Sequence, residues 1–419
     1  MNEAARESPS GLVEHYFRHA YGRLVATLAR RFGLASLQRV EDAVQEALLS
    51  ALTAWSLRGV PDDPGAWLYR VAFNTLRDQS RRDGAWSRAA ERVREVAPTE
   101  SPAPEATFEG DLDDDELRML FVCCDARLPP PSQIALALKV LCGFSVREIA
   151  LRLLTTEANV YKRVTRAREA LREGALDLDA PPDVTERLPA VHAVLYLLFN
   201  EGYCAASGDA LVRRELCEEA LRLAHILLRH KGCDVPETRA LVGLFHLQSA
   251  RLSTRVDAAG ELLTLAEQDR TQWDREEILL GLRWLHASAE GGVFSRYHAE
   301  AAIAAEHALA PSFDATRWEE IAELYTLLDR RLPSPLHALN RAVALAEARG
   351  AQAGIDSLEG VRLPPGLAGY YLWDAVVGDL LRRAGHPAQA IAYLERASVA
   401  APTEAERALL RRRIASCGG

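Results

Sequence analysis

The sequence predicts an all-α protein built from several domains. Apolar residues recur at i, i+3, i+4 and i+7 over long stretches that contain little proline or glycine, and no alternating strand pattern appears. At 419 residues, the chain exceeds one ordinary domain and suits about three. Its composition, 48% hydrophobic and 26% charged, is typical of a globular protein rather than a disordered one.

Breaks in this pattern predict four segments. We expect a helical unit over residues 11–94, an acidic flexible linker over 95–116, a second helical unit over 117–175 and a long helical tail over 184–419. The linker carries nine acidic and no basic residues, with several prolines. Such a stretch cannot bury a core and repels itself, so it favours an extended chain.

Within the first unit, residues 66–82 predict a helix with two different sides. At 100° per residue its apolar positions fall on one side. The other side carries cations, an amide and, at its edge, an indole: Trp67, Arg70, Asn74, Arg77 and Arg81. Cations suit phosphates, a flat ring suits a base, and an amide can read a base edge, so this side predicts contact with single-stranded DNA. A solvated basic face with a partly buried tryptophan is the alternative.

The preceding helix, near residues 40–53, has an acidic outer side. Its apolar positions can face inward, which leaves Asp42, Gln45 and Glu46 outward. An acidic patch beside a DNA-reading helix is unfavourable for a free DNA binder. It suits a protein that docks on a basic partner.

The second unit predicts a helix-turn-helix. Ser145 and Glu148 have the spacing of a capping box at the start of the first helix, and the second helix is expected to begin near Thr155. Its outward positions are Asn159, Lys162, Arg163 and Arg166, and Arg168 follows them. We expect Lys162 and Arg163 to reach base edges in a major groove, and the two later arginines to contact phosphates.

The order of these motifs resembles a bacterial RNA polymerase sigma factor of the extracytoplasmic-function type. The resemblance rests on the acidic run Asp42-Ala43-Val44-Gln45-Glu46, the stretch from Trp67 to Arg82, the acidic linker and the helix-turn-helix. It implies that the acidic patch binds core RNA polymerase. The Trp67 helix would then melt and capture the −10 element, the second helix-turn-helix helix would read the −35 element, and the linker would thread the RNA path. The family's usual glycine between the two helices is absent here, so −35 specificity does not transfer.

The tail fits stacked helical hairpins. Gly378, Leu381, Ala390, Leu394 and Ala397, followed by a proline, match a tetratricopeptide pattern. The tail also resembles the C-terminal extension of one sigma-factor subgroup, which implies regulation in cis. A protein or a small molecule could act as the effector.

Three blocks of the tail suggest an enzyme: residues 196–203, 297–307 and 318–320. None has a nucleophile, base and orienting group or a metal-ligand spacing, and the seven cysteines form no Cys-x-x-Cys pair. We therefore expect no catalytic residue, cofactor or metal. Two alternatives stay open: a helix-turn-helix regulator whose repeat domain binds an effector without polymerase, and an enzyme with its site in the tail.

Charge and hydropathy set the expected surroundings. A net charge of −9 argues against indiscriminate coating of DNA, but allows local basic patches on a protein carried by a larger partner. Because no apolar run reaches membrane-helix length and no secretory signal is visible, we expect a cytoplasmic protein without membrane contact.

Overall fold

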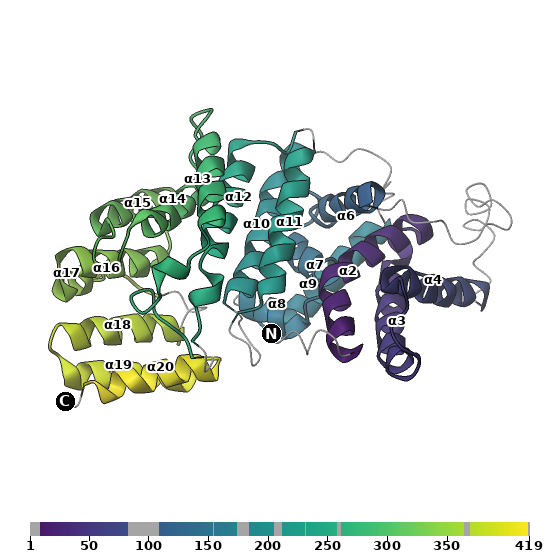
Figure 1. The fold of residues 1–419 in the computed structure, drawn as a ribbon. Helices are drawn as coiled ribbons and strands as arrows, with labels where there is room; N and C mark the ends of the chain where they lie inside the picture. The colour runs from purple at the N-terminus through teal and green to yellow at the C-terminus, as the bar shows by residue number, and fades with distance from the viewer. Residues whose placement is uncertain are drawn as a thin grey trace. The chain divides into compact units, whose positions relative to one another are not determined.

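The structure is a computed structural model that describes residues 9–82, 109–153, 155–173, 184–204, 212–230, 232–257, 261–363 and 369–417; within these ranges, the side chains of 9–19, 82, 109–114 and 184 are left aside. Every regular element in these ranges is a helix, and one isolated bridge joins Val256 to Leu262 (Figure 1). The all-α prediction is confirmed there. The chain divides into two compact units, residues 1–198 and 199–419.

The first unit begins with three helices, α2 (Pro9–Phe32), α3 (Leu37–Arg58) and α4 (Pro64–Arg82). Each of the first two ends at a glycine with positive φ, Gly33 at 82° and Gly59 at 80°. Glycine adopts this conformation without the steric penalty that a Cβ atom brings. The three helices pack on one another around a buried apolar core.

Four more helices follow in this unit: α6 (Glu109–Cys123), α7 (Pro130–Val140), α8 (Val146–Arg152) and α9 (Glu157–Glu173). Helix α6 packs on α2, while α7, α8 and α9 pack on each other. The backbones of α2 and the end of α7 approach closely, because a Cβ atom at Gly22 would lie 2.5 Å from the carbonyl oxygen of Leu141. Only glycine fits this contact.

The predicted C-terminal boundary of the acidic linker is wrong. Residues 109–116 were expected to be extended, but they form the start of α6, with Asp115 and Glu116 buried. Two arginines of α2 supply the counter-charges: Arg30 donates to Asp115 over 2.7 Å, and Arg23 lies 3.7 Å from Glu116. Acidic residues can be buried when they are paired in this way. The rest of the linker lies outside the described residues, as does the prediction that it threads the RNA path.

Helix α10 (Val184–Tyr203) belongs to both units, since the division falls between Leu198 and Phe199. Near its start, Arg187 donates to the carbonyl oxygen of Phe121 at 3.0 Å and to the Asp125 carboxylate at 2.8 Å. The first turns of the predicted tail therefore belong to the unit that holds the helix-turn-helix.

The second unit is a succession of helices in which neighbours in sequence pack side by side (Figure 1). They are α11 (Arg214–Arg229), α12 (Pro236–Ser249), α13 (Arg275–Ser288), α14 (Arg296–Leu309), α15 (Trp318–Arg331), α16 (Pro335–Arg349), α17 (Ala351–Asp356), α18 (Tyr371–Arg383), α19 (Pro387–Ala400) and α20 (Glu404–Ala415). None of the helices in the described ranges is both long and apolar enough to cross a membrane.

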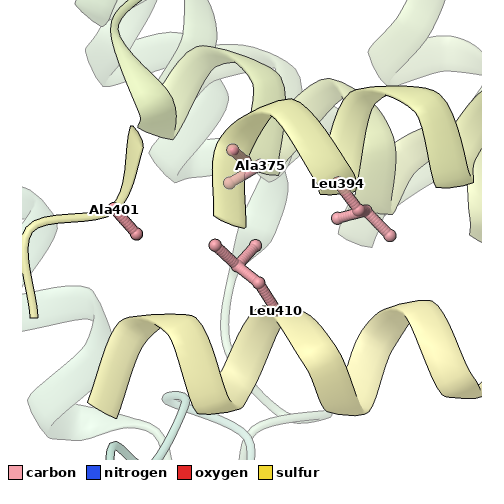
Figure 2. Packing of buried hydrophobic residues seen from close by; sticks show 5 residues of the cluster. Ala375, Leu394, Ala401 and Leu410 are labelled. Atoms are coloured by element: carbon pink, nitrogen blue, oxygen red, sulfur yellow. The ribbon is translucent and has the colours of Figure 1, made fainter. Parts of the chain in front are cut away.

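The last hairpin contains the small residues that the sequence analysis singled out. A Cβ atom at Gly378 of α18 would lie 2.8 Å from the Leu394 side chain of α19, so the glycine lets the two helices touch. Ala397 and Leu394 join Ala375 and Leu410 in one buried cluster (Figure 2). Helix α20 thereby completes the core of this hairpin. Assignment to the tetratricopeptide family stays a prediction.

Candidate nucleic-acid interface

Helix α3 presents the predicted acidic patch to solvent. Asp42, Gln45 and Glu46 are exposed, while the apolar positions between them are buried. Two leucines extend the same stripe by one and two turns, since Leu49 is 65% exposed and Leu52 is exposed as well. The outer face of α3 is therefore acidic at one end and apolar at the other, which suits a protein partner. Sequence reasoning missed the leucines, although the spacing from Asp42 signals them.

Helix α4 has the two sides expected of it. Leu68, Ala72 and Leu76 are fully buried. On the opposite side Arg70, Asn74 and Arg81 are exposed, and Arg77 is half-buried, with Nε 3.6 Å from the Asp78 carboxylate. The predicted DNA-facing residues of this helix thus lie together on one accessible side.

Trp67 is held in place by a second tryptophan. Its ring lies 5.7 Å from that of buried Trp55 in an edge-to-face arrangement, a favoured geometry for aromatic pairs. Asp63 fixes the start of the helix, because its carboxylate accepts from the Ala66 amide at 2.8 Å and its carbonyl from the Trp67 amide at 3.1 Å. Trp67 is half-buried and keeps an accessible edge beside the cations.

A second aromatic group stands further along α4. Tyr69 stacks on Phe73, and the guanidinium of Arg31 lies 5.9 Å from the Tyr69 ring centre. Burial raises the pKa of Tyr69, although Arg31 opposes the shift. No local pattern in the sequence indicates the contact of Tyr69 with Arg31.

The helix-turn-helix forms as predicted. The Ser145 side chain accepts from the Glu148 amide at 3.2 Å, and the Glu148 carboxylate accepts from the Ser145 amide at 2.7 Å, which completes the capping box. On α9 the buried positions are Val160, Val164, Ala167 and Leu171. These positions fix which side of α9 faces outward.

The outward side of α9 borders a basic hollow of about 370 Å³. Asn159, Lys162 and Arg166 are exposed, Arg163 is half-buried, and all four line this hollow. Arg127 and Ser132, just before and within α7, line its other wall. Sequence reasoning missed these two, because they lie about thirty residues upstream and no local periodicity connects them to α9.

Arg127 is oriented by an acid that two arginines share. The Asp125 carboxylate accepts from Arg127 Nε at 2.8 Å and from Arg187 at 2.8 Å. Burial alone would raise the pKa of Asp125, but the hydrogen bonds from Arg127 and the charge of Arg187 hold it below its usual value. Asp125 is therefore ionised and keeps Arg127 at the rim of the hollow.

Arg168 differs from the other predicted DNA-binding residues of α9. It is half-buried and pairs with Glu41 of α3, a carboxylate that is 2% exposed. Burial raises the pKa of Glu41 to about 7, although Arg168 and Lys139 lower it. In this arrangement Arg168 joins α9 to α3, next to Asp42, and its phosphate contact stays a prediction.

Cys123 and Cys124 are buried, and two of the blocks of the tail that suggested an enzyme have structural contacts. Burial raises the pKa of the Cys123 and Cys124 thiols well above their usual value, which favours the unreactive protonated form. Buried His298 contacts Ser295 and the carbonyl oxygen of Ser288, and Glu319 pairs with an arginine. Among the described residues no group of three or more potential ligands could hold a metal ion.

Comparison with known proteins gives three domain matches in chain order. Residues 17–86 match Sigma-70 region 2, residues 118–171 match Sigma-70 region 4, and residues 187–289 match a family of unknown function, DUF6596. An uncharacterized protein of Rhizobium meliloti (strain 1021) is 36% identical over 415 residues, which cover 98% of this chain and 93% of that protein. No solved structure matches the chain. The two sigma matches coincide with the α2–α4 and α6–α9 helices.

Proposed function

We propose that this chain, in which residues 17–86 and 118–171 match Sigma-70 regions 2 and 4, acts as an extracytoplasmic-function type sigma factor of the sigma-70 family. Members of that family recognise promoters for RNA polymerase and are not themselves enzymes. In this role the chain docks on core polymerase through the outer face of α3. It reads the −35 element with α9, melts the −10 element against α4, and is regulated in cis by its C-terminal helices.

The outer face of α3 is the observation that carries this proposal. Asp42, Gln45 and Glu46 lie exposed on one stripe with Leu49 and Leu52. The acids suit a basic polymerase surface and steer the encounter, while the leucines supply apolar area. A regulator that acts without polymerase would have no use for an acidic and apolar stripe in the same unit as two cationic DNA-facing helices.

The DNA part of the proposal divides between two helices. Exposed Lys162 and Arg166 on α9 suit the edge and backbone of a duplex. The exposed cations of α4, next to the half-buried ring of Trp67, suit a single strand with an unstacked base. Strand opening then draws on binding energy alone, and no residue acts as a catalyst.

Co-elution with bacterial core polymerase, together with run-off transcription, tests the docking surface. The charge reversals Asp42→Lys and Glu46→Lys should weaken polymerase binding by at least tenfold and reduce transcription equally, because they oppose a basic partner. Glu395→Lys is the matched control, since Glu395 is exposed on α19. Unchanged affinity in the double reversal, with unchanged circular dichroism, contradicts the docking assignment.

The rival function is an effector-binding helix-turn-helix regulator, and duplex binding separates it. A sigma factor should bind promoter duplex weakly without polymerase, whereas the rival should bind it tightly alone. A mobility-shift titration of the full chain with and without core polymerase distinguishes the two. Tight binding by the free protein favours the rival.

Regulation in cis is tested by truncation after Cys204. This point keeps Arg187 and its bonds to Phe121 and Asp125, which removal from residue 184 would break. The truncated chain should support transcription at a level at least several-fold different from the full chain. Equal transcription by an equally stable truncation rules out regulation by the C-terminal helices.

A further inference from the structure

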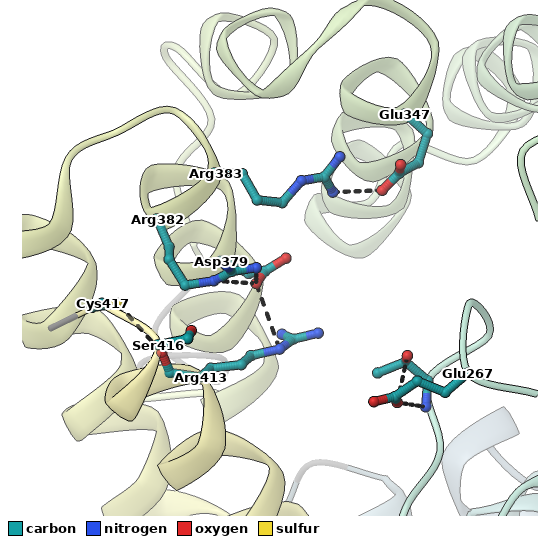
Figure 3. Close-up of polar contacts among 9 residues, drawn as sticks. Glu267, Glu347, Asp379, Arg382, Arg383, Arg413, Ser416 and Cys417 are labelled. Carbon is teal, nitrogen blue, oxygen red and sulfur yellow. Dashed lines mark hydrogen bonds and ion pairs between the residues drawn. The ribbon is translucent and has the colours of Figure 1, made fainter. Parts of the chain in front are cut away.

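Many arginines of the second unit are neutralised by a carboxylate. Around α18, Asp379 lies 2.9 Å from Arg382 and 3.5 Å from Arg413, and Glu347 pairs with Arg383 (Figure 3). In each of these pairs the carboxylate balances the positive charge of the arginine. A half-buried guanidinium group without a carboxylate partner is therefore unusual in this unit.

Arg251 and Arg255, which follow α12, form such an exception. Both are half-buried, and the Nε atom of each is buried without a hydrogen-bond partner. Within the described part of the chain neither guanidinium has a carboxylate partner. Both lie instead against the ring of Tyr203 at the end of α10, with guanidinium carbons 3.8 Å (Arg255) and 5.4 Å (Arg251) from the ring centre.

The surroundings add positive charge. Arg270 is fixed by hydrogen bonds to the carbonyl oxygens of His307, at 2.6 Å, and Ala310, at 2.9 Å. Burial, together with the charges of Arg251 and Arg270, lowers the pKa of His307 to about 3, so that histidine stays neutral. The neighbouring carboxylate of Glu300 is engaged by Arg296 at 3.0 Å.

The arrangement is unfavourable unless an anion is present. A cation against an aromatic face gains about 0.5–2 kcal/mol, but removing a charge from water without a partner costs several kcal/mol. Two guanidinium groups on one ring also repel each other. Glu201, in the same block as Tyr203, is already paired with Arg213.

We propose that Arg251, Arg255 and Tyr203 form a binding site for a phosphoryl dianion, the phosphate group of a small molecule. The guanidinium carbons of Arg251 and Arg255 lie 5.4 Å and 3.8 Å from the same ring centre, so the Tyr203 ring is common to both cations. Guanidinium groups match phosphate oxygens in a bidentate geometry. The buried Tyr203 hydroxyl has no hydrogen-bond partner among the described residues and supplies a further donor.

The donor set selects phosphate over a single carboxylate. Two cations call for two negative charges. A phosphate monoester supplies two charges on three free oxygens, whereas a carboxylate supplies one charge. The site joins two blocks that promoter recognition leaves unexplained, residues 196–203 and the His307 neighbourhood, and it gives the C-terminal helices a ligand.

Thermal unfolding of the full chain, titrated with inorganic phosphate at constant ionic strength, tests the site. The unfolding midpoint should rise and saturate with phosphate, as expected when a ligand binds only the folded state. Glycerol phosphate tests an ester source, and acetate is the monoanion control. A larger response to glycerol phosphate identifies an ester as the ligand, and a larger response to inorganic phosphate identifies free phosphate. Equal responses show that the site recognises the phosphoryl group alone, and a response to acetate as large as that to phosphate overturns the proposal.

Variants separate binding from a structural role. Arg251→Gln and Arg255→Gln should each weaken the phosphate response at least tenfold, while their unfolding midpoint in phosphate-free buffer stays equal or rises. Arg283→Gln is the matched control, because Arg283 is an exposed arginine on α13. Destabilised variants that keep the wild-type phosphate response overturn the proposal. If neither arginine variant folds, Tyr203→Phe keeps the ring and removes one donor, and an unchanged phosphate affinity then overturns it.

This site is independent of the proposed function. The titration uses no polymerase and no DNA, so it can fail while promoter recognition stands, and the reverse also holds. If both stand, phosphate added to the run-off assay should alter transcription by the wild-type chain and leave transcription by Arg255→Gln unaltered.

Discussion

The two units differ in where they place the arginines that have no carboxylate partner among the described residues. On α4 and α9 of the first unit Arg70, Arg81 and Arg166 are exposed along extended helix faces. In the second unit Arg251 and Arg255 are half-buried and gathered on one ring. An exposed row suits a long polyanion, in which release of counterions drives binding. Two half-buried guanidinium groups on one ring suit a small anion, which can take the place of the water around them.

The exposure of an arginine and its pairing with a carboxylate together determine what the side chain can bind. Arg168 lies two residues from Arg166, yet it is half-buried and paired with Glu41. Arg166 and Arg168 therefore have different roles, because they project from different sides of α9.

Breaking the buried pair should be asymmetric. Glu41→Gln leaves the Arg168 guanidinium half-buried without its partner, and it should lower the unfolding free energy by about 3 kcal/mol. Arg168→Gln should cost less, because Glu41, with a pKa raised to about 7, can take up a proton, whereas arginine stays charged. Urea unfolding of both variants at pH 7 checks the order. Equal losses would show that protonation does not relieve the Glu41 charge.

Removing exposed cations of α9 should affect promoter recognition and leave stability unchanged. Lys162→Ala with Arg166→Ala should reduce transcription from a −35-dependent promoter by roughly tenfold to a hundredfold, since the base-edge contact expected of Lys162 contributes about 1–3 kcal/mol. Run-off transcription and a thermal melt provide the two readouts. Arg172→Ala, an exposed arginine in the last turn of α9, serves as the control. A similar loss in the control would mean that bulk charge, not position, decides.

Acid should destabilise both units through one buried histidine in each. Burial lowers the pKa of His192 to about 4, and burial with two arginines lowers that of His307 to about 3. The unfolded chain then binds more protons below about pH 6.5, so stability is lost as pH falls from there toward 4. Each histidine should account for about 1 kcal/mol between pH 6.5 and 5.5.

Denaturant unfolding at several pH values measures these losses. Gln variants at positions 192 and 307 should flatten the acid slope of the unfolding free energy. Glu41 acts in the opposite sense: its raised pKa makes the folded state bind the extra proton between about pH 4.5 and 7, and stability from this group falls as pH rises. Measurements on a Glu41→Gln background therefore isolate the histidines. An unchanged slope in both Gln variants would contradict the assignment.

Local patterns in the sequence predict the helices and their faces well. The buried positions of α9 and the exposed patch at Asp42 follow from a period of 3.6 residues. The capping box at Ser145 follows from a serine at the N-cap with a glutamate three residues later. Each is decided within one or two turns of helix. The prediction needs no knowledge of what packs against the helix from elsewhere.

Contacts between distant segments could not be predicted in this way. Glu41 and Arg168 are 127 positions apart, and nothing local to either indicates the other. The helical and buried state of Asp115 depends on Arg30 of α2, so composition alone suggested an extended acidic linker. The gathering of Arg255 on Tyr203 likewise depends on how helices pack, and no spacing in the sequence encodes it.

Arg127 and Arg187, which lie far apart in the sequence, both donate to the Asp125 carboxylate and share its single negative charge. Whatever anion neutralises Arg127 at the rim of the α9 hollow leaves more of the Asp125 charge to Arg187, at the start of α10. DNA engaged at α9 would thereby tighten the anchorage of α10. Thermodynamic reciprocity requires that loosening this anchorage weakens DNA binding by the same free energy.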